Sequence, residues 1–414
     1  MDDLVTDNEQ EEQLDPRIVA GWRALESGEF AEARAAAEAV LAESPASKPA
    51  GIVTSKGGSG KSAGSGRGGA GQPTVIDATR LDALLLRAAC AREEGEPEVA
   101  MQSLEQAAKE DPEWCTPELW MAELLSEDPE RLDEALRHAR RALDHADEED
   151  EYLAALATKA AIELELGRPT EARKTLTGLP PGDAPLDDVG TALDFAQLLM
   201  DAGDPGEARA RLKTLTEQAP ALADAWYLLG VAAELLEDED GKRAAWVKTR
   251  ALDLAASDSA AGAADHDDHD HDHGHDHGDH HHHDHDHAHA HPRAALTEEV
   301  LVAVAEEALA EMPDELRAHM RNVPVVVAEL PAAEDVAAGM DPRLLGLFSG
   351  TPHSESGGVL APPSLTQILL FRRNIERMAD DEDTLREEVR TTLLHEAGHF
   401  FGLDEGALAR LGLQ

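Results

Sequence analysis

The hydrophobic and polar positions of this chain follow two different patterns. Between residues 14 and 256, Leu, Ala and Val recur every three or four positions among Glu and Arg, which indicates helices with one buried face. From residue 293 to 414 the pattern is mixed and contains two short apolar runs typical of strands, VPVVVAEL (323–330) and QILLFRR (367–373). The pattern therefore predicts a mainly α chain that ends in a small α+β domain.

Three residue types recur at fixed spacing in the helical part. We expect glycine to turn the chain between paired helices, alanine to let the helices pack closely, and proline to end the second helix. The spacing is identical in three units: Gly28, Ala33 and Pro45; Gly95, Ala100 and Pro112; Gly203, Ala208 and Pro220. Gly167 with Ala172 suggests a fourth unit, and Ala135 with Ala142 suggests a fifth that lacks the glycine.

These units resemble the tetratricopeptide repeat (TPR), a helix pair that carries W-x2-L-G, Gly-Asp, Glu-Ala and a closing proline. The segment DAWYLLGVAAEL, with Trp226, Leu229 and Gly230, has the first of these elements. The resemblance implies a TPR-like α-solenoid over residues 14–256, with a groove that binds protein or peptide partners. The alternative is an irregular helical bundle without a groove.

A glycine-rich insertion, residues 48–73, interrupts the repeats. Within it GIVTSKGGSGKSAGSG resembles the deviant phosphate loop of the ParA and MinD ATPases. A phosphate loop needs a helix directly after Lys61 and Ser62, and the glycines that follow cannot sustain one. We therefore interpret the insertion as a flexible linker.

Charge and composition limit the possible partners. The net charge of −49 repels phosphate backbones, so we expect no nucleic acid and no anionic membrane as a partner. The chain has no apolar run long enough to span a membrane, and its acidic start, which lacks the pattern of a signal peptide, predicts a cytoplasmic protein. The N-terminal segment 1–13 reads as a disordered tail, and Cys90 and Cys115 as reduced, partly buried thiols.

A tract of Asp and His separates the repeats from the last domain. Residues 257–292 cannot bury a core, and the stretch 265–291 holds 14 of the 20 histidines, so we predict a disordered linker. Imidazole and carboxylate groups suit divalent zinc, nickel or copper, so the tract is a candidate for metal buffering.

The stretch HEAGHFFGLDE (395–405) carries the strongest chemical signal. Residues 381–402 read as one amphipathic helix, on which His395 and His399 share a face and can hold one zinc ion. Glu396 beside them can act as general base towards water, and Gly402 permits a turn after the helix. Glu405 stands where a longer HExxHxxGxxH signature places its third ligand, with Asp404 as a competitor.

This region resembles the small bacterial zincin-like metallopeptidases, from about residue 296 to 413. The resemblance implies that His395, His399 and Glu405 bind zinc and that Glu396 is the general base, although the family often has Asp where this chain has Glu405. It also implies that QILLFRR flanks the cleft as an edge strand. Further candidates to steady an oxyanion are His353, Arg372 and Arg373.

The sequence leaves three functions open. The first is a zinc-dependent metallopeptidase whose repeats recruit the substrate or a partner. The second is a non-catalytic TPR scaffold with a metal-binding zincin-like domain, although Glu396 would have no use in a purely structural site. The third is a metal buffer centred on the tract 265–291.

Overall fold

The structure is a computed structural model, and it describes a defined part of the chain. The described residues are 15–43, 77–182, 186, 188–263, 298–311, 320, 323–350, 367–378, 382–401, 403, 404, 406 and 410. The acidic tail 1–13, the insertion 48–73 and the tract 265–291 lie outside them, so what the sequence predicts for these segments stays a prediction. The elements form two compact units, one within residues 1–184 and 197–204, the other within 185–196 and 205–414.

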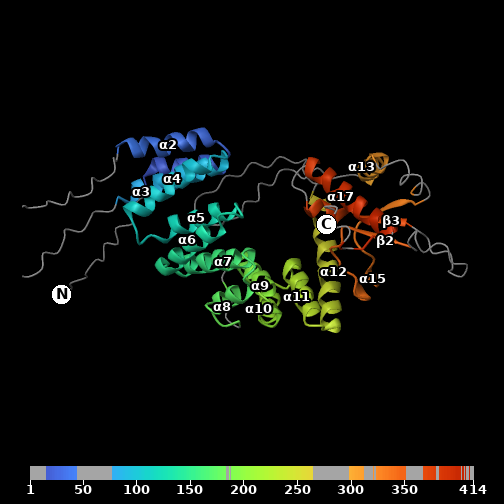
Figure 1. The fold of residues 1–414 in the computed structure, drawn as a ribbon. Helices are drawn as coiled ribbons and strands as arrows, with labels where there is room; N and C mark the ends of the chain where they lie inside the picture. Colours follow the sequence, from blue (N-terminus) through green and yellow to red (C-terminus); the bar gives the residue numbers. More distant parts are fainter. Residues whose placement is uncertain are drawn as a thin grey trace, which may run out of the picture. The chain divides into compact units, whose positions relative to one another are not determined.

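The first unit is built from consecutive helix pairs, drawn from blue to green in Figure 1. From α1 to α8, each helix contacts the next one along the chain, as expected for stacked repeats. The helices are α1 (Pro16–Glu26), α2 (Phe30–Glu43), α3 (Ala78–Glu93), α4 (Pro97–Glu110), α5 (Cys115–Ser126), α6 (Leu132–His145), α7 (Glu149–Glu165) and α8 (Pro169–Leu176), and α9 (Val189–Asp201) is shared between the units.

The turns between paired helices confirm the predicted role of glycine. Gly28, Gly95, Gly167 and Gly203 all have positive φ, from 68° to 79°. At Gly203 the next amide, of Asp204, donates to the Leu199 carbonyl at 2.7 Å, and the Gly203 amide donates to Met200 at 2.9 Å, which is a Schellman C-cap. The same pair of hydrogen bonds closes the other three turns.

Alanine and proline also behave as the sequence predicts. Ala33, Ala100, Ala172 and Ala208 are buried, at 0 to 2 % exposure, where a larger side chain would separate the helices. Helices α2, α4 and α10 each end two residues before their proline, because the residue preceding a proline is disfavoured in a helix. These features confirm the helix–turn–helix repeat.

The second unit joins the last repeat to the α+β segment. Helix α10 (Pro205–Gln218) precedes the pair α11 (Ala223–Leu235) and α12 (Glu239–Ala263), and α12 contacts α15. The remaining elements, orange to red in Figure 1, are α13 (Glu298–Glu311), β1 (Val325–Ala328), α15 (Ala333–Ala337), β2 (Gly346–Ser349), β3 (Gln367–Phe371), α16 (Arg372–Met378) and α17 (Glu382–Phe400).

The three strands form one sheet in the order β1-β3-β2. Strand β3 runs parallel to β1 and antiparallel to β2, with Ile368 opposite Val325 and Phe348. The prediction that QILLFRR is an edge strand is therefore wrong, because it takes the centre, where Ile368 and Leu370 are fully buried. Among the described residues, β1 and β2 are the outer strands of the sheet.

Two helices cover one face of this sheet and form the core with it. Helix α13 contacts β1, α17 contacts β2 and β3, and the two helices contact each other. The apolar positions predicted for the last helix are all buried at 0 to 6 % exposure and belong to this core: Leu385, Val389, Leu393 and Phe400. The core therefore fixes which face of α17 turns to the sheet.

Two general expectations can be compared with the described residues. Cys90 and Cys115 are free and buried, and burial raises the pKa of each thiol to about 11, so both are unreactive thiols near neutral pH. Within the described parts of the chain, no helix combines the length and the apolar composition needed to cross a bilayer.

Candidate metal centre

Helix α17 brings the two candidate histidine ligands together. The Nε2 atoms of His395 and His399 lie 3.1 Å apart, and their rings meet edge to face at 78°. Two imidazole nitrogens, each about 2.0–2.1 Å from a tetrahedral zinc ion, would be separated by about 3.3 Å. The two side chains therefore fit a shared metal ion with almost no rearrangement.

The other ring nitrogen of His399 decides which tautomer the ring adopts. Nδ1 lies 3.1 Å from the carbonyl oxygen of Leu403, which can only accept a hydrogen bond. A neutral His399 thus carries its proton on Nδ1, and the lone pair is on Nε2, the atom that faces His395. A carbonyl that orients a ligating imidazole in this way is the usual support of a zinc site.

The chain turns at the end of α17, as the sequence predicts. The Leu403 amide donates to the Gly398 carbonyl at 3.0 Å, which brings the Leu403 carbonyl back beneath His399. Gly402 itself, the predicted cause of the turn, lies outside the described residues.

Glu396 lies beside the histidine pair but is held by the sheet. Its side chain is buried at 6 % exposure, and its Oε2 accepts a hydrogen bond of 2.5 Å from the Phe348 amide in β2. The Phe348 ring in turn packs edge to face on Phe400, with ring centroids 5.8 Å apart. Strand β2 therefore fixes the candidate general base.

The close approach of β2 to α17 depends on a glycine. A Cβ at Gly346 would lie 2.7 Å from Cγ2 of Thr392 and 3.0 Å from Cγ of Glu396. Neither distance is compatible with a normal van der Waals contact, so Gly346 leaves the space that these two side chains fill. Sequence reasoning missed both Gly346 and the Phe348 amide, although a glycine inside the apolar run LLGLF is a signal of close approach.

Within the described residues, the edge of β2 that faces away from β3 has no strand beside it. The Phe371 amide donates to the Leu345 carbonyl at 2.8 Å, so residues 345, 347 and 349 form the hydrogen-bonded pairs with β3. By alternation, the backbone groups of Gly346 and Phe348 point away from β3, and the Phe348 amide reaches Glu396 for this reason. The strand that borders the site is therefore β2 and not β3.

The third ligand stays a prediction. Glu405 lies outside the described residues, and Asp404, its competitor, is exposed. Within the described residues no group of three or more His, Cys, Asp or Glu side chains is arranged to hold a metal ion. His353 also lies outside them.

The two arginines considered as oxyanion donors are engaged elsewhere. Arg372 Nη2 lies 2.6 Å from Oε1 of Glu329, and Arg373 Nε lies 2.5 Å from its Oε2. Burial alone would raise the pKa of Glu329, but these two partners lower it overall. The pair therefore clamps the end of β1 to the end of β3.

Comparisons with known proteins agree with this architecture. Residues 320–413 match the model of the zincin-like metallopeptidase family, and residues 82–113 and 193–264 match two tetratricopeptide repeat models. The chain thus carries tetratricopeptide repeats followed by a zincin-like metallopeptidase domain. No curated protein matches it.

Several solved structures resemble the chain at low identity. The pilus biogenesis factor PilW is 16 % identical, with a TM-score of 0.39 over 57 % of this chain and 91 % of PilW. Pseudomonas aeruginosa pilF is 17 % identical, with a TM-score of 0.39 over 61 % of this chain and 96 % of that one. YrrB, a TPR protein with an unusual peptide-binding site, is 19 % identical, with a TM-score of 0.33 over 44 % and 91 %. At these values the likenesses assign no function.

Proposed function

We propose that this protein is a zinc-dependent metallopeptidase, with His395, His399 and Glu405 as ligands and Glu396 as general base. The observation that carries the proposal is the pair of Nε2 atoms 3.1 Å apart, with Nδ1 of His399 bound by the Leu403 carbonyl so that its Nε2 is left to bind metal. Bound zinc supplies a Lewis acid that polarises the scissile carbonyl and acidifies the attacking water. A carboxylate in the third position is compatible with zinc.

Glu396 moves the proton in this proposal. As a carboxylate it accepts a proton from the attacking water and then delivers it to the leaving amine. The amide of Phe348 holds Oε2 at 2.5 Å and so fixes the orientation of the group. A carboxylate has lone pairs on both oxygens, so this hydrogen bond leaves Glu396 able to act as a base.

We infer that the substrate peptide binds in an extended conformation along β2. The backbone groups of Gly346 and the carbonyl of Phe348 point to the free edge of the sheet, on the side of Glu396. An added strand pairs with such an edge through main-chain hydrogen bonds, which carry little sequence preference. Recognition of particular substrates then falls to other parts of the chain.

The repeats are the part that we assign to recruitment. A cavity of about 520 Å³ lies among α6, α7 and α8 in the first unit. Its lining side chains are Arg140, Lys159 and Lys174, with Glu163, Glu171 and Thr175, and Lys159 forms an ion pair of 2.9 Å with Glu163. The three cations exceed the two carboxylates, so the lining is positive in a chain of strongly negative net charge. This chemistry favours a carboxylate group of a peptide or protein partner.

The experiment that tests the hydrolase compares Glu396→Gln with wild type in the full chain. We expect the variant to keep one tightly bound zinc, because the ligands are unchanged, and to lose cleavage of an unfolded protein substrate by at least about 100-fold. The matched control is Glu387→Gln, an exposed Glu on the same helix, which should cleave like wild type. Equal cleavage by wild type and Glu396→Gln would refute the assignment.

Metal analysis separates the alternatives. Deletion of 265–291 should remove loosely bound divalent metal and leave one tight ion, which His395→Ala should then abolish. Loss of all metal on the deletion alone would favour the metal buffer. Retention of the tight ion without hydrolysis by wild type would favour the non-catalytic scaffold.

A further inference from the structure

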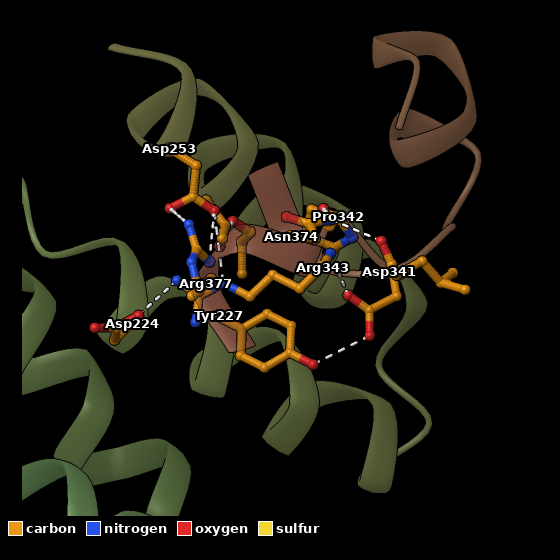
Figure 2. Close-up of polar contacts among 11 residues, drawn as sticks. Asp224, Tyr227, Asp253, Asp341, Pro342, Arg343, Asn374 and Arg377 are labelled. Carbon is orange, nitrogen blue, oxygen red and sulfur yellow. Dashed lines mark hydrogen bonds and ion pairs between the residues drawn. The ribbon is translucent and has the colours of Figure 1, made fainter. Parts of the chain in front are cut away.

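The last repeat contacts the segments that flank the candidate site through a network of charged side chains (Figure 2). Arg377 of α16 donates from both terminal nitrogens to the carboxylate of Asp253 in α12, at 2.8 and 3.2 Å. Arg343, three residues before β2, forms an ion pair of 3.5 Å with the same carboxylate. Its Nη2 also donates to Asp224 at the start of α11, at 2.6 Å.

Asp253 is the centre of this network. Its side chain is 6 % exposed, and a carboxylate so deeply buried is tolerated only when it is paired with cations and hydrogen-bonded. The two arginines satisfy this requirement from two different segments of the zincin-like domain. Asp253 therefore ties both segments to α12 at once.

A second set of contacts holds the residues immediately before Arg343. The Tyr227 hydroxyl of α11 donates to Oδ2 of Asp341 at 3.1 Å, and the Arg343 guanidinium lies 4.5 Å from the centre of the Tyr227 ring. Oδ1 of Asp341 accepts from the Arg343 amide at 2.7 Å. As Figure 2 shows, Tyr227 lies directly against the Asp341–Arg343 turn.

The same turn is anchored from its other side. The side-chain amide of Asn374, in α16, donates to the carbonyls of Pro342 at 2.9 Å and Leu344 at 2.7 Å. Residue 345 then pairs with Phe371, and β2 starts at Gly346. The turn 341–345 is thus held between the repeat and α16, and it leads without a break into the strand whose Phe348 amide binds Glu396.

We propose that the last repeat is a positioning element of the metal site: Asp253 and Tyr227, through Arg343, set the position of β2 and so of Glu396. The route ends at the Glu396 carboxylate, which the Phe348 amide holds, whereas the ring of His399 is oriented by the Leu403 carbonyl. The expected effect on turnover rests on the proposed hydrolase function, whereas the expected effect on the stability of β2 can be measured without any activity.

The test uses the full chain with Asp253→Asn, which removes one charge and keeps the shape. We expect amide hydrogen exchange of residues 344–349 to accelerate at least about tenfold, and kcat to fall with little change in KM, while zinc content stays at wild type. Tyr227→Phe, which deletes one hydroxyl, should give a smaller change in the same direction and serves if Asp253→Asn fails to fold. The control is Asp240→Asn, a fully exposed Asp on the same helix, which should alter none of these quantities.

The two possible failures are distinguishable. Equal exchange of residues 344–349 in wild type and in both variants overturns the positioning role, whatever happens to turnover. A wild-type chain without hydrolytic activity refutes the proposed function, and the exchange rates then decide the positioning role alone.

Discussion

Replacing Gly346 by alanine tests how the sheet positions the candidate general base. The added methyl would lie 2.7 Å from Cγ2 of Thr392, 3.0 Å from Cγ of Glu396 and 3.2 Å from the Leu369 carbonyl. All three neighbours belong to packed elements, so β2 has to move away from α17 or Glu396 has to change its rotamer. Either movement breaks the hydrogen bond of Glu396 with the Phe348 amide.

Two opposing terms set the size of the effect. Overpacking a filled site costs about 1–3 kcal/mol. Alanine in a strand is more favourable than glycine by about 0.5–1 kcal/mol, because the unfolded chain with alanine has less conformational entropy to lose on folding. The net expectation for Gly346→Ala is a loss of about 0–2.5 kcal/mol in the free energy of unfolding. Because a misplaced base impairs proton transfer, we also expect kcat to fall by about tenfold or more.

A double-mutant cycle isolates the contact. Thr392→Ser removes the methyl that the new Cβ would meet, and alone it should cost about 1 kcal/mol for the lost buried methyl. Combined with Gly346→Ala it should restore part of the stability, with a coupling of about 1 kcal/mol by urea unfolding. The control is Ser349→Ala, on the opposite face of β2. Additive single effects, or full activity of Gly346→Ala, would refute the close-packing argument.

Two further predictions concern the repeats. Glu237 occupies the left-handed turn position (φ 57°) that glycine takes in four other repeats, so Glu237→Gly should stabilise the chain by up to about 1 kcal/mol in urea unfolding. Gly203→Ala should instead cost about 1 kcal/mol, although no atom lies within 4 Å of the added methyl. Effects of the opposite signs would contradict the turn argument. Burial alone would raise the pKa of Glu118, but the 2.6 Å hydrogen bond with His138 lowers it overall. The ionised Glu118 therefore stabilises the folded chain above the ordinary pKa of 4.5, and this contribution is lost as the pH falls through the pKa of the folded state. Glu118→Gln should therefore reduce the loss of thermal stability on acidification below pH 4.5, and an identical pH profile would contradict this.

The features that the sequence predicts well are local ones. A glycine at a turn or a buried alanine in a helix pair depends on a few neighbours, and Gly203 and Ala208 behave as their spacing predicts. The facing histidines follow in the same way from the geometry of one helix, since His395 and His399 are four residues apart.

The features that the sequence did not predict depend on distant partners. The central place of β3 depends on which strands pair with Ile368 on either side, and the apolar run alone is equally compatible with an edge. The pairing of Asp253 with Arg377, 124 residues away, has no local signature either. Glu405 as third ligand stays a prediction from spacing.

The contacts of α12 have a consequence for the repeat array itself. A stack of helical repeats normally needs a polar terminal helix, because its last packing face would otherwise meet water. Here Arg250 of α12 donates to the Pro331 carbonyl at 2.6 Å, and α12 packs against α15, so the zincin-like domain covers that face. A fragment that ends at Ala263 would expose this packing face to water and should self-associate. The last repeat and the zincin-like domain should therefore be expressed together.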